Sequence, residues 1–414
     1  MTENTIFILS NHDYFNRSGA AIARIYNYAR ALTLDENTKV VLLSFKLSGR
    51  LDSRKELFKN TFVAGENPIH ANKGTAYFLR NFYFISSFLF LAKLVREIRR
   101  NHVKPFSFII FSMRIFDDIL ILLFLKVWLG SKVVCEKNEI LYTIILNKTW
   151  PTNYFKKFIF LLVFSFKIST SFLTDLMVVF YDGVIAISTN IRDWVLRYNK
   201  NVVLIPILSN DNFLPDKKPG NASDDFMIGY AGSLTLKKDG LRELILSIQI
   251  LVKEGHKIRL NIFGSGNKED VSFLNSLIAS QSLSDHVFMR GQVTQAALQE
   301  ELRRHDLLVL PRPESKQAHY GFSTKLAEYL STGIPVLATD VSDNKRYLQD
   351  GINAYLLDDL TPENLAEKLK KIIREDKDKR DQIGLNGLSV SQNEFHFSKH
   401  SNTLLSFLQE IPAA

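Results

Sequence analysis

The sequence predicts an α/β protein with two doubly wound domains, and three observations support this prediction. The chain has 414 residues, enough for two domains that each bury a core. Its 46% hydrophobic residues, 23% charged residues, 19 Gly and 11 Pro are typical of a globular protein. Short apolar runs alternate with helical stretches along the whole chain. Runs that are apolar without alternation favour parallel strands buried on both faces.

We expect these runs to form six strands in each half of the chain. Those of the first half are residues 5–11, 39–45, 107–113, 131–137, 183–188 and 202–207. Those of the second half are residues 226–232, 257–264, 286–291, 306–311, 335–340 and 354–359. The helical stretches between them predict crossover connections and therefore two parallel sheets.

A domain boundary is expected where Pro, Asn, Asp and Gly cluster and the periodicity lapses, in residues 206–225. We therefore expect an N-terminal domain at residues 1–205 and a C-terminal domain at residues 206–390. Residues 391–414 are expected to form a C-terminal helix that packs back toward the N-terminal domain.

Cysteine content and hydropathy predict a cytoplasmic protein. A single cysteine, Cys135, can form neither an internal disulfide nor a Cys-rich zinc site. The N-terminus has no basic region before its short apolar run, which argues against a signal peptide. The longest uncharged apolar stretches, residues 81–92 and 158–166, are shorter than the roughly 18 residues of a membrane span.

The charge is unevenly distributed. Residues 1–210 contain 27 Lys and Arg against 15 Asp and Glu, whereas the rest contains 25 against 28. A basic, Phe-rich half is compatible with nucleic acid, an anionic membrane surface or a phosphorylated ligand, and no nucleic-acid motif favours the first. Residues 78–100 and 153–167 mix aromatic residues with Lys and Arg, as interfacial segments or core helices with basic ends would.

Ligands of doubly wound sheets bind beyond the carboxyl ends of the strands, so the loops there contain the candidate residues. After the first strand, Ser18 and Gly19 open a helix, which suits either an anion site or a simple capped turn. After the strand at 131–137, Asn138 and Glu139 would either line a cleft or form a surface turn. An Asp-Lys-Asp run in residues 374–381 is a weak metal-site candidate, because solvated helix charges explain it.

Two loops in the second half have more specific features. Gly232 and Ser233 follow a strand and precede Lys238, so the backbone can approach a ligand while an ammonium neutralises phosphate. Further on, Ser323 and Thr324 begin a helix whose free amides favour a phosphate. Glu328 follows one turn later, within reach of a sugar hydroxyl of the same ligand.

The segments GYAGSLTLKKDG, LNIFGSG, VFMRGQV, DLLVLPRP and GFSTKLAEYLSTGIPVLATD resemble, in order and spacing, the glycosyltransferases with the GT-B fold. The resemblance is greatest to family 4 enzymes of bacterial surface-polysaccharide synthesis. It is strong from residue 183 to about 390 and weak over residues 5–45. It implies two Rossmann-like domains facing across a cleft, with a nucleoside diphosphate sugar on the second and an acceptor on the first. It also implies no metal and no cofactor.

The resemblance assigns roles to individual residues. Lys238 matches the lysine that binds the donor diphosphate, Ser323 and Thr324 match the helix N-terminus beneath it, and Glu328 matches the glutamate that binds the ribose. Gly232 belongs to the same donor loop.

Two departures from the family pattern matter for the predicted site. Tyr320 stands where a second glutamate is usual, and Ser233 stands where many members have Arg. We expect Arg312 and Lys325, which flank the loop that leads into the helix beginning at Thr324, to supply the missing charge. A bacterial RP-x-S-x-Q-A pattern adds Ser315 and Gln317 to the donor side. The usual acceptor-side histidine has no equivalent, so Asn138, Glu139, Ser18 and Gly19 are the acceptor candidates.

The resulting hypothesis is a metal-independent hexosyltransferase, retaining by family resemblance, with Lys238, Glu328 and Arg312 as candidate catalytic residues. Its partners would be a nucleoside diphosphate sugar and a glycan or lipid-linked glycan, with peripheral membrane attachment as an option and no nucleic acid. The alternative, suggested by Tyr320, is a GT-B-fold protein that binds a glycan or nucleotide without turnover.

Overall fold

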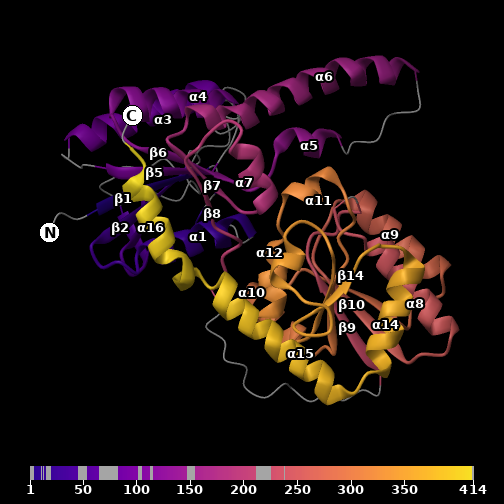
Figure 1. Cartoon of the computed structure of the whole chain (residues 1–414). Helices are drawn as coiled ribbons and strands as arrows, with labels where there is room; N and C mark the ends of the chain where they lie inside the picture. Colours follow the sequence, from indigo (N-terminus) through magenta and orange to yellow (C-terminus); the bar gives the residue numbers. More distant parts are fainter. Residues whose placement is uncertain are drawn as a thin grey trace. The chain divides into compact units, whose positions relative to one another are not determined.

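The computed structural model describes residues 4–10, 12, 14, 20–44, 54–64, 83–100, 105–111, 115–146, 154–210, 225–236 and 238–412. It divides into two compact units (Figure 1). The first comprises Met1–Leu208 together with Phe397–Ala414, and the second comprises Ser209–His396. The second unit is thus inserted in sequence between two parts of the first.

The first unit contains an eight-stranded sheet in the order β3-β4-β2-β1-β5-β6-β7-β8. Its strands are β1 Asn4–Ser10, β2 Thr38–Ser44, β3 Arg54–Phe58, β4 Thr61–Ala64, β5 Pro105–Phe111, β6 Val133–Lys137, β7 Gly183–Ala186 and β8 Val202–Leu204. All pairs are parallel except β3 with β4. The six strands expected here are confirmed. The edge strands β3 and β4 were not predicted, because they are short and β3 is mostly polar.

Helices pack on both faces of this sheet. They are α1 Ala20–Leu32, α3 Tyr83–Arg100, α4 Ile115–Leu122, η2 Leu123–Trp128, α5 Leu141–Leu146, α6 Tyr154–Leu176, η3 Met177–Phe180, α7 Thr189–Val195, η5 Phe397–His400 and α16 Ser401–Glu410. Ile6 and Ile8 of β1 pack with α1 and α16, whereas Phe7 and Leu9 pack with α3 and α4. Successive residues of a strand point to opposite faces, which explains why residues 6–9 of this strand, buried on both faces, are all apolar.

The second unit contains a six-stranded parallel sheet in the order β11-β10-β9-β12-β13-β14. Its strands are β9 Phe226–Ala231, β10 Ile258–Phe263, β11 Val287–Gly291, β12 Leu307–Leu310, β13 Val336–Thr339 and β14 Tyr355–Leu357. Its helices are α8 Leu241–Lys253, α9 Lys268–Ser280, α10 Gln295–Leu302, α11 Lys316–Tyr320, α12 Thr324–Leu330, α13 Asn344–Tyr347, α14 Pro362–Arg374, α15 Lys377–Val390 and η4 Ser391–Phe395. The six expected strands are confirmed. Both sheets therefore confirm the doubly wound α/β class.

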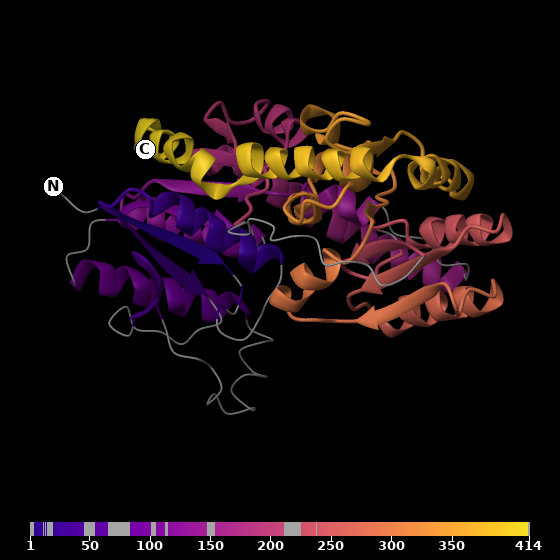
Figure 2. The same cartoon turned by 90° about the horizontal axis from the view of Figure 1, so that it is seen from below.

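The last residues differ from the single helix expected over 391–414. Ser391–Phe395 continue α15 as η4 of the second unit, and His396 is extended, which ends the helix. The chain re-enters the first unit at Phe397, and α16 lies beside α1 in both views (Figures 1 and 2). The Ser401 hydroxyl donates to the Ala31 carbonyl at 2.6 Å, and Leu404 and Leu408 are fully buried.

Hydropathy gives no candidate membrane span among the helices of the described residues. None of them is both long enough and apolar enough to cross a bilayer.

A buried ion pair joins α6 to the carboxyl end of β6. Lys137 Nζ lies 2.5 Å from Asp175 Oδ1, and these side chains are 2% and 0% exposed. The Asp175 carboxylate also accepts the amides of Leu141 and Tyr142, both at 3.0 Å. The Asp175 side chain of α6 therefore binds both the end of β6 and the start of α5.

We predict that Lys137→Met destabilises the protein strongly, because it leaves the Asp175 charge buried without its cation. Breaking one partner of a buried pair costs about 3–5 kcal/mol in the free energy of unfolding. Asp175→Asn added to Lys137→Met should recover part of this loss. Urea unfolding followed by circular dichroism measures both effects. The control is Lys59→Met, which removes an exposed pair with Glu36 and should change little. Equal effects of the Lys59 and Lys137 variants would contradict the prediction.

Candidate active site

The carboxyl ends of β9, β10 and β12 carry the loops that the sequence analysis singled out in the second unit. The loop after β9 and the loop after β10 are in direct contact there. Gly232 donates its amide to the Phe263 carbonyl at 2.9 Å, and Leu234 donates to the Ser265 carbonyl at 3.0 Å. Gly264 has φ +137°, and a Cβ at this residue would overlap the Gly232 carbonyl. Glycine is therefore required for this close backbone approach.

A second contact at this edge joins α12 to the loop after β9. The Lys325 ammonium contacts the Asp239 carboxylate and donates to the Tyr230 hydroxyl at 2.9 Å. The Tyr230 hydroxyl in turn donates to Asp239 at 2.7 Å. A Cβ at Gly232 would overlap the end of the Lys325 side chain. Gly232 thus leaves the space through which Lys325 reaches its partners.

Neighbouring groups shift the pKa of the Lys325 ammonium in opposite directions. Burial lowers its pKa most, and the positive charges of Lys238 and Arg312 lower it further, while Asp239 raises it. Burial likewise raises the pKa of Tyr230 well above its ordinary value, so this phenol stays protonated and can donate. Three cations therefore converge on one edge of the sheet.

Arg312 is fixed by the neighbouring strand β13. Its amide donates to the Thr339 hydroxyl oxygen at 2.9 Å, and that hydroxyl donates to the Arg312 carbonyl at 2.6 Å. The residue is only 6% exposed. A Cβ at Gly321 would lie 3.2 Å from a terminal nitrogen of Arg312, so the guanidinium packs against this glycine. The Arg312 side chain is thus held against Gly321, in the segment that leads into α12.

The two short helices after β12 place the remaining donor candidates. The Ser315 hydroxyl accepts the Ala318 amide at 3.0 Å and so caps α11. The Gln317 carbonyl accepts the Gly321 amide at 2.9 Å, which ends α11 and turns the chain toward α12. Ser323 precedes α12 without capping it through its side chain, and Thr324 is the first residue of that helix.

Tyr329 anchors α12 to β9. Its hydroxyl accepts the Ala231 amide at 2.6 Å and donates to the Ala231 carbonyl at 2.9 Å. The preceding residue, Glu328, is half-buried in the second turn of α12. The two hydrogen bonds of Tyr329 therefore fix the position of α12, and with it Glu328, relative to the loop after β9.

The structure brings the donor candidates of the second unit together on the loops after β9 and β12. Two of these side chains have polar partners within the second unit. Lys325 is bound to Asp239, and the Ser233 hydroxyl lies 2.8 Å from the Thr235 hydroxyl. Sequence reasoning missed Asp239, because an acidic residue after two lysines is typical of a solvated turn. It also missed Tyr230 and Tyr329, which are expected in the core on hydropathy alone.

The acceptor candidates lie in the first unit. Ser18 and Gly19 are outside the described residues. Asn138 and Glu139 follow β6 directly and are half-buried. The neighbouring Glu136 forms a 2.9 Å ion pair with Arg24 of α1, and both side chains are at most 10% exposed. Burial raises the pKa of Glu136 despite the nearby arginine.

Metal ligands are not clustered in the part of the chain that the structure describes. No group of three or more His, Cys, Asp or Glu side chains there is arranged to hold an ion. The Asp-Lys-Asp run of residues 374–381 lies at the start of α15. Its first carboxylate, Asp376, caps that helix by accepting the amides of Asp378 and Lys379.

Comparison with known proteins gives matches in sequence and in fold. Residues 213–389 match the family model described as glycosyl transferases group 1. The capsular polysaccharide biosynthesis glycosyltransferase CapM of Staphylococcus aureus is 26% identical over 190 residues. That match covers 45% of this chain and 46% of CapM, so it spans about half of the curated relative.

Solved structures match over nearly the whole chain. Sucrose-phosphate synthase from Thermosynechococcus elongatus has a TM-score of 0.73 at 15% identity, over 99% of both chains. Anabaena HepE in complex with UDP and glucose has a TM-score of 0.65 at 16% identity, over 98% of this chain and 99% of HepE. A variant of TarM from S. aureus in complex with UDP has a TM-score of 0.67 at 12% identity, over 99% of this chain and 100% of TarM.

At these identities the solved structures establish the fold, while the match to the family model lies within the second unit. The narrower assignment to family 4 stays a prediction. The chain has the two-domain fold of the GT-B glycosyltransferases, and its residues 213–389 match the family model of the glycosyl transferases group 1.

Proposed function

We propose that the protein transfers a hexosyl unit from a nucleoside diphosphate sugar to a hydroxyl of a glycan or lipid-linked glycan in surface-polysaccharide synthesis. The observation that carries this proposal is that two cationic side chains, Lys325 against Gly232 and Arg312 against Gly321, lie beside the glycine-containing segments at the start of α12 and after β9. The description of CapM as a capsular polysaccharide enzyme supports the pathway class. The UDP in the HepE and TarM structures supports a UDP-sugar as the first donor to test.

The proposed donor site holds the diphosphate by charge and by backbone amides. Lys238 is exposed in the loop after β9, and we propose that its ammonium contacts the diphosphate. Arg312 and Lys325 are largely buried, so a phosphate beside them would interact in a medium of low polarity. The free amides at the start of α12 add donors on the same side.

Glu328 would accept hydrogen bonds from the ribose hydroxyls of the donor. It follows the first turn of α12, so a nucleotide with its diphosphate at Ser323 and Thr324 brings the ribose to its carboxylate. Tyr320 stands where a second sugar-binding carboxylate is usual in the family. We propose that Gln317, half-buried on α11, supplies a polar contact on that side.

The proposed reaction retains the anomeric configuration and needs no metal. The acceptor hydroxyl approaches the anomeric carbon from the face on which the diphosphate leaves. The bond between this carbon and the diphosphate oxygen breaks, the bond to the acceptor oxygen forms, and a phosphate oxygen takes the hydroxyl proton. Lys238, Arg312 and the α12 amides stabilise the charge on the leaving diphosphate. Asn138 and Glu139 are the proposed acceptor contacts on the first unit.

We also propose that the first unit binds an anionic membrane surface from the cytoplasmic side. Val127, Trp128 and Phe180 are 71%, 50% and 59% exposed, although all are large and apolar. They lie close together, because Lys126 of η2 donates to the Phe180 carbonyl at 3.1 Å. Arg99 of α3 donates to the Trp128 carbonyl at 2.5 Å and so places a cation at the edge of this apolar patch. Exposed aromatic residues beside cations suit a headgroup interface.

Lys238→Ala and Glu328→Ala should each lower kcat/KM about a hundredfold, because the first loses ~3 kcal/mol of charge stabilisation on the leaving diphosphate and the second loses a hydrogen-bonded contact to the donor. Transfer from UDP-, GDP- and ADP-sugars to glycan acceptors measures this. A thermal-shift screen with the free nucleotides measures binding, since a ligand at a hundred times its Kd adds about 2.7 kcal/mol of stability. The shift should be absent in Glu328→Ala.

Two matched controls keep this test specific. Glu363→Ala and Lys268→Ala change exposed residues at the starts of α14 and α9 in the same unit, and both should behave as wild type. Near-normal turnover of Lys238→Ala or Glu328→Ala would overturn the site assignment. Nucleotide binding without transfer to any acceptor would favour the alternative of a non-catalytic binding protein.

Turnover should be unchanged by excess EDTA, because the cations of the chain supply the charge that a metal would otherwise provide. The measurement is the initial transfer rate with EDTA and, separately, with added Mg²⁺ or Mn²⁺. A loss of rate in EDTA that either ion restores would refute the proposed metal independence.

The protein should sediment with anionic liposomes and less so at high salt, because salt screens the attraction between Lys or Arg and the headgroups. Val127→Asp combined with Phe180→Asp should reduce the bound fraction, because carboxylates enter the apolar patch. Leu385→Asp, at a 50% exposed position of α15 in the second unit, is the control and should bind as wild type. Failure of the wild-type protein to sediment at any salt concentration would refute membrane binding.

A further inference from the structure

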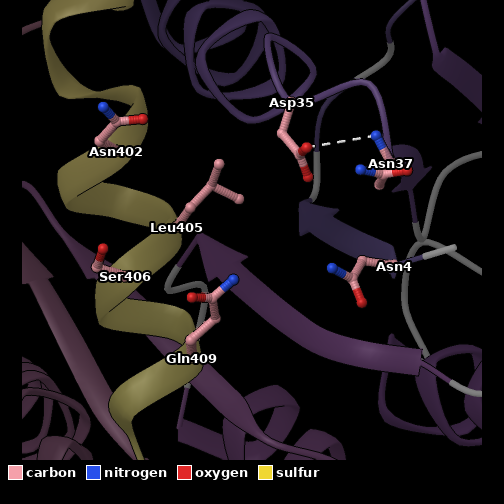
Figure 3. A pocket seen from close by; sticks show the side chains of 7 residues that line it. All are labelled: Asn4, Asp35, Asn37, Asn402, Leu405, Ser406 and Gln409. Carbon is pink, nitrogen blue, oxygen red and sulfur yellow. Dashed lines mark hydrogen bonds between the residues drawn. The ribbon is translucent and has the colours of Figure 1, made fainter. Parts of the chain in front are cut away.

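An open groove of about 580 Å³ lies in the first unit, at the amino ends of its strands. Figure 3 shows its two sides, which are α16 and the chain around the starts of β1 and β2. Its volume lies within the range of small-molecule sites. The candidate acceptor residues follow the opposite, carboxyl end of the same sheet, so this groove is a separate place on the unit.

Helix α16 has two distinct faces. Ser401, Leu404 and Leu408 are buried against the sheet and α1. Asn402, Leu405, Ser406 and Gln409 form the other face, at the spacing i, i+3, i+4, i+7, and line the groove. Helix positions at this spacing share one side, so three polar side chains and one leucine are presented together.

The facing wall is also polar and is held rigid by its backbone. Asn4, the first residue of β1, donates its amide to the Asn37 carbonyl at 2.9 Å. Asp35 accepts the Thr38 hydroxyl at 2.5 Å, which fixes the turn that precedes β2. The side chains of Asn4 and Asn37 lie across from α16 (Figure 3).

Four amide side chains around the groove keep their hydrogen-bonding capacity for a ligand. Asn4, Asn37, Asn402 and Gln409 make no side-chain hydrogen bond to another of the residues that the structure describes. Each amide offers two donors and one acceptor oxygen. Both walls of the groove therefore offer hydrogen-bond donors and acceptors, with Leu405 as an apolar contact.

We propose that this groove binds a neutral segment of a glycan chain. Sugar hydroxyls donate and accept at once, which matches amide side chains, and the C–H face of a sugar ring matches Leu405. The groove lining contains no Lys or Arg, although the chain has 52 of them. This disfavours nucleotides and other phosphorylated ligands. The polarity of the lining disfavours a protein partner, because interface cores are apolar.

The identification of this glycan with the acceptor polymer rests on the proposed function. The seven residues of β1 span about 23 Å at ~3.3 Å per residue, and the candidate acceptor residues lie at the far end of that sheet. A chain of several sugars can cover such a distance. The groove would then hold an earlier part of the polymer while the end of the polymer is extended. Such tethering raises the effective concentration of that end at the acceptor site.

The test measures oligosaccharide binding directly and needs no turnover. Isothermal titration of the full chain uses maltohexaose, cellohexaose and N-acetylchitohexaose as neutral probes, with a heparin hexasaccharide and UDP as charged probes. At least one neutral probe should bind. Asn402→Leu combined with Gln409→Leu should weaken that binding about tenfold or more, because two hydrogen-bonding groups are removed. Thr403→Leu, at the adjacent exposed position of α16, should leave it unchanged.

The outcomes separate this inference from the proposed function. Neutral binding that the double variant weakens supports the groove even if no donor sugar is ever transferred. No binding of any neutral probe, or equal affinity of the wild type and the double variant, overturns the inference. Weakened binding of UDP or heparin alone in the double variant would also overturn it, because the groove would then be an anion site.

Discussion

The contact between Lys325 and Asp239 is the interaction on which the arrangement of the candidate site depends. It joins α12 to the loop after β9, two segments 86 residues apart in sequence. The ammonium is buried, and burial lowers its pKa most, while Asp239 raises it and the repulsion of Lys238 and Arg312 lowers it further. A diphosphate bound beside these three cations would offset their mutual repulsion and raise the pKa of Lys325.

Both units use buried ion pairs at the carboxyl ends of their strands. In the first unit the pairs are Lys137 with Asp175 and Arg24 with Glu136, and in the second it is Lys325 with Asp239. Burying an ion pair costs desolvation free energy. Apolar residues of similar volume at the same positions often give the protein equal stability, so such pairs are weak evidence of stability. Their geometry does fix the position of a helix or loop relative to the end of a strand. This edge is also where the candidate ligand-binding residues lie.

Local patterns predicted the fold well, because parallel strands buried on both faces leave a clear apolar signature. Every strand expected from such a run is present. The two that were missed, β3 and β4, lie at the edge of the first sheet, and β3 contains Arg54, Lys55 and Glu56. The break at His396 was also missed, because an extended residue between two helical stretches has no compositional signal. The candidate site followed from glycine and lysine positions, whereas Asp239 and Tyr230 were not predicted because their roles arise from contacts distant in sequence.

The inserted position of the second unit bears on how the chain folds as it is synthesised. Leu404, Leu408 and Ile411 are at most 3% exposed in the core of the first unit, yet they follow the whole of the second unit in the sequence. Ile411 packs so closely on β7 that a Cβ at Gly183 would lie 2.5 Å from it. N-terminal domains generally fold first during synthesis, but here the first unit lacks part of its core until the second unit has been synthesised. The inserted unit, Ser209–His396, is therefore synthesised in full before the helix α16 that completes the core of the first unit.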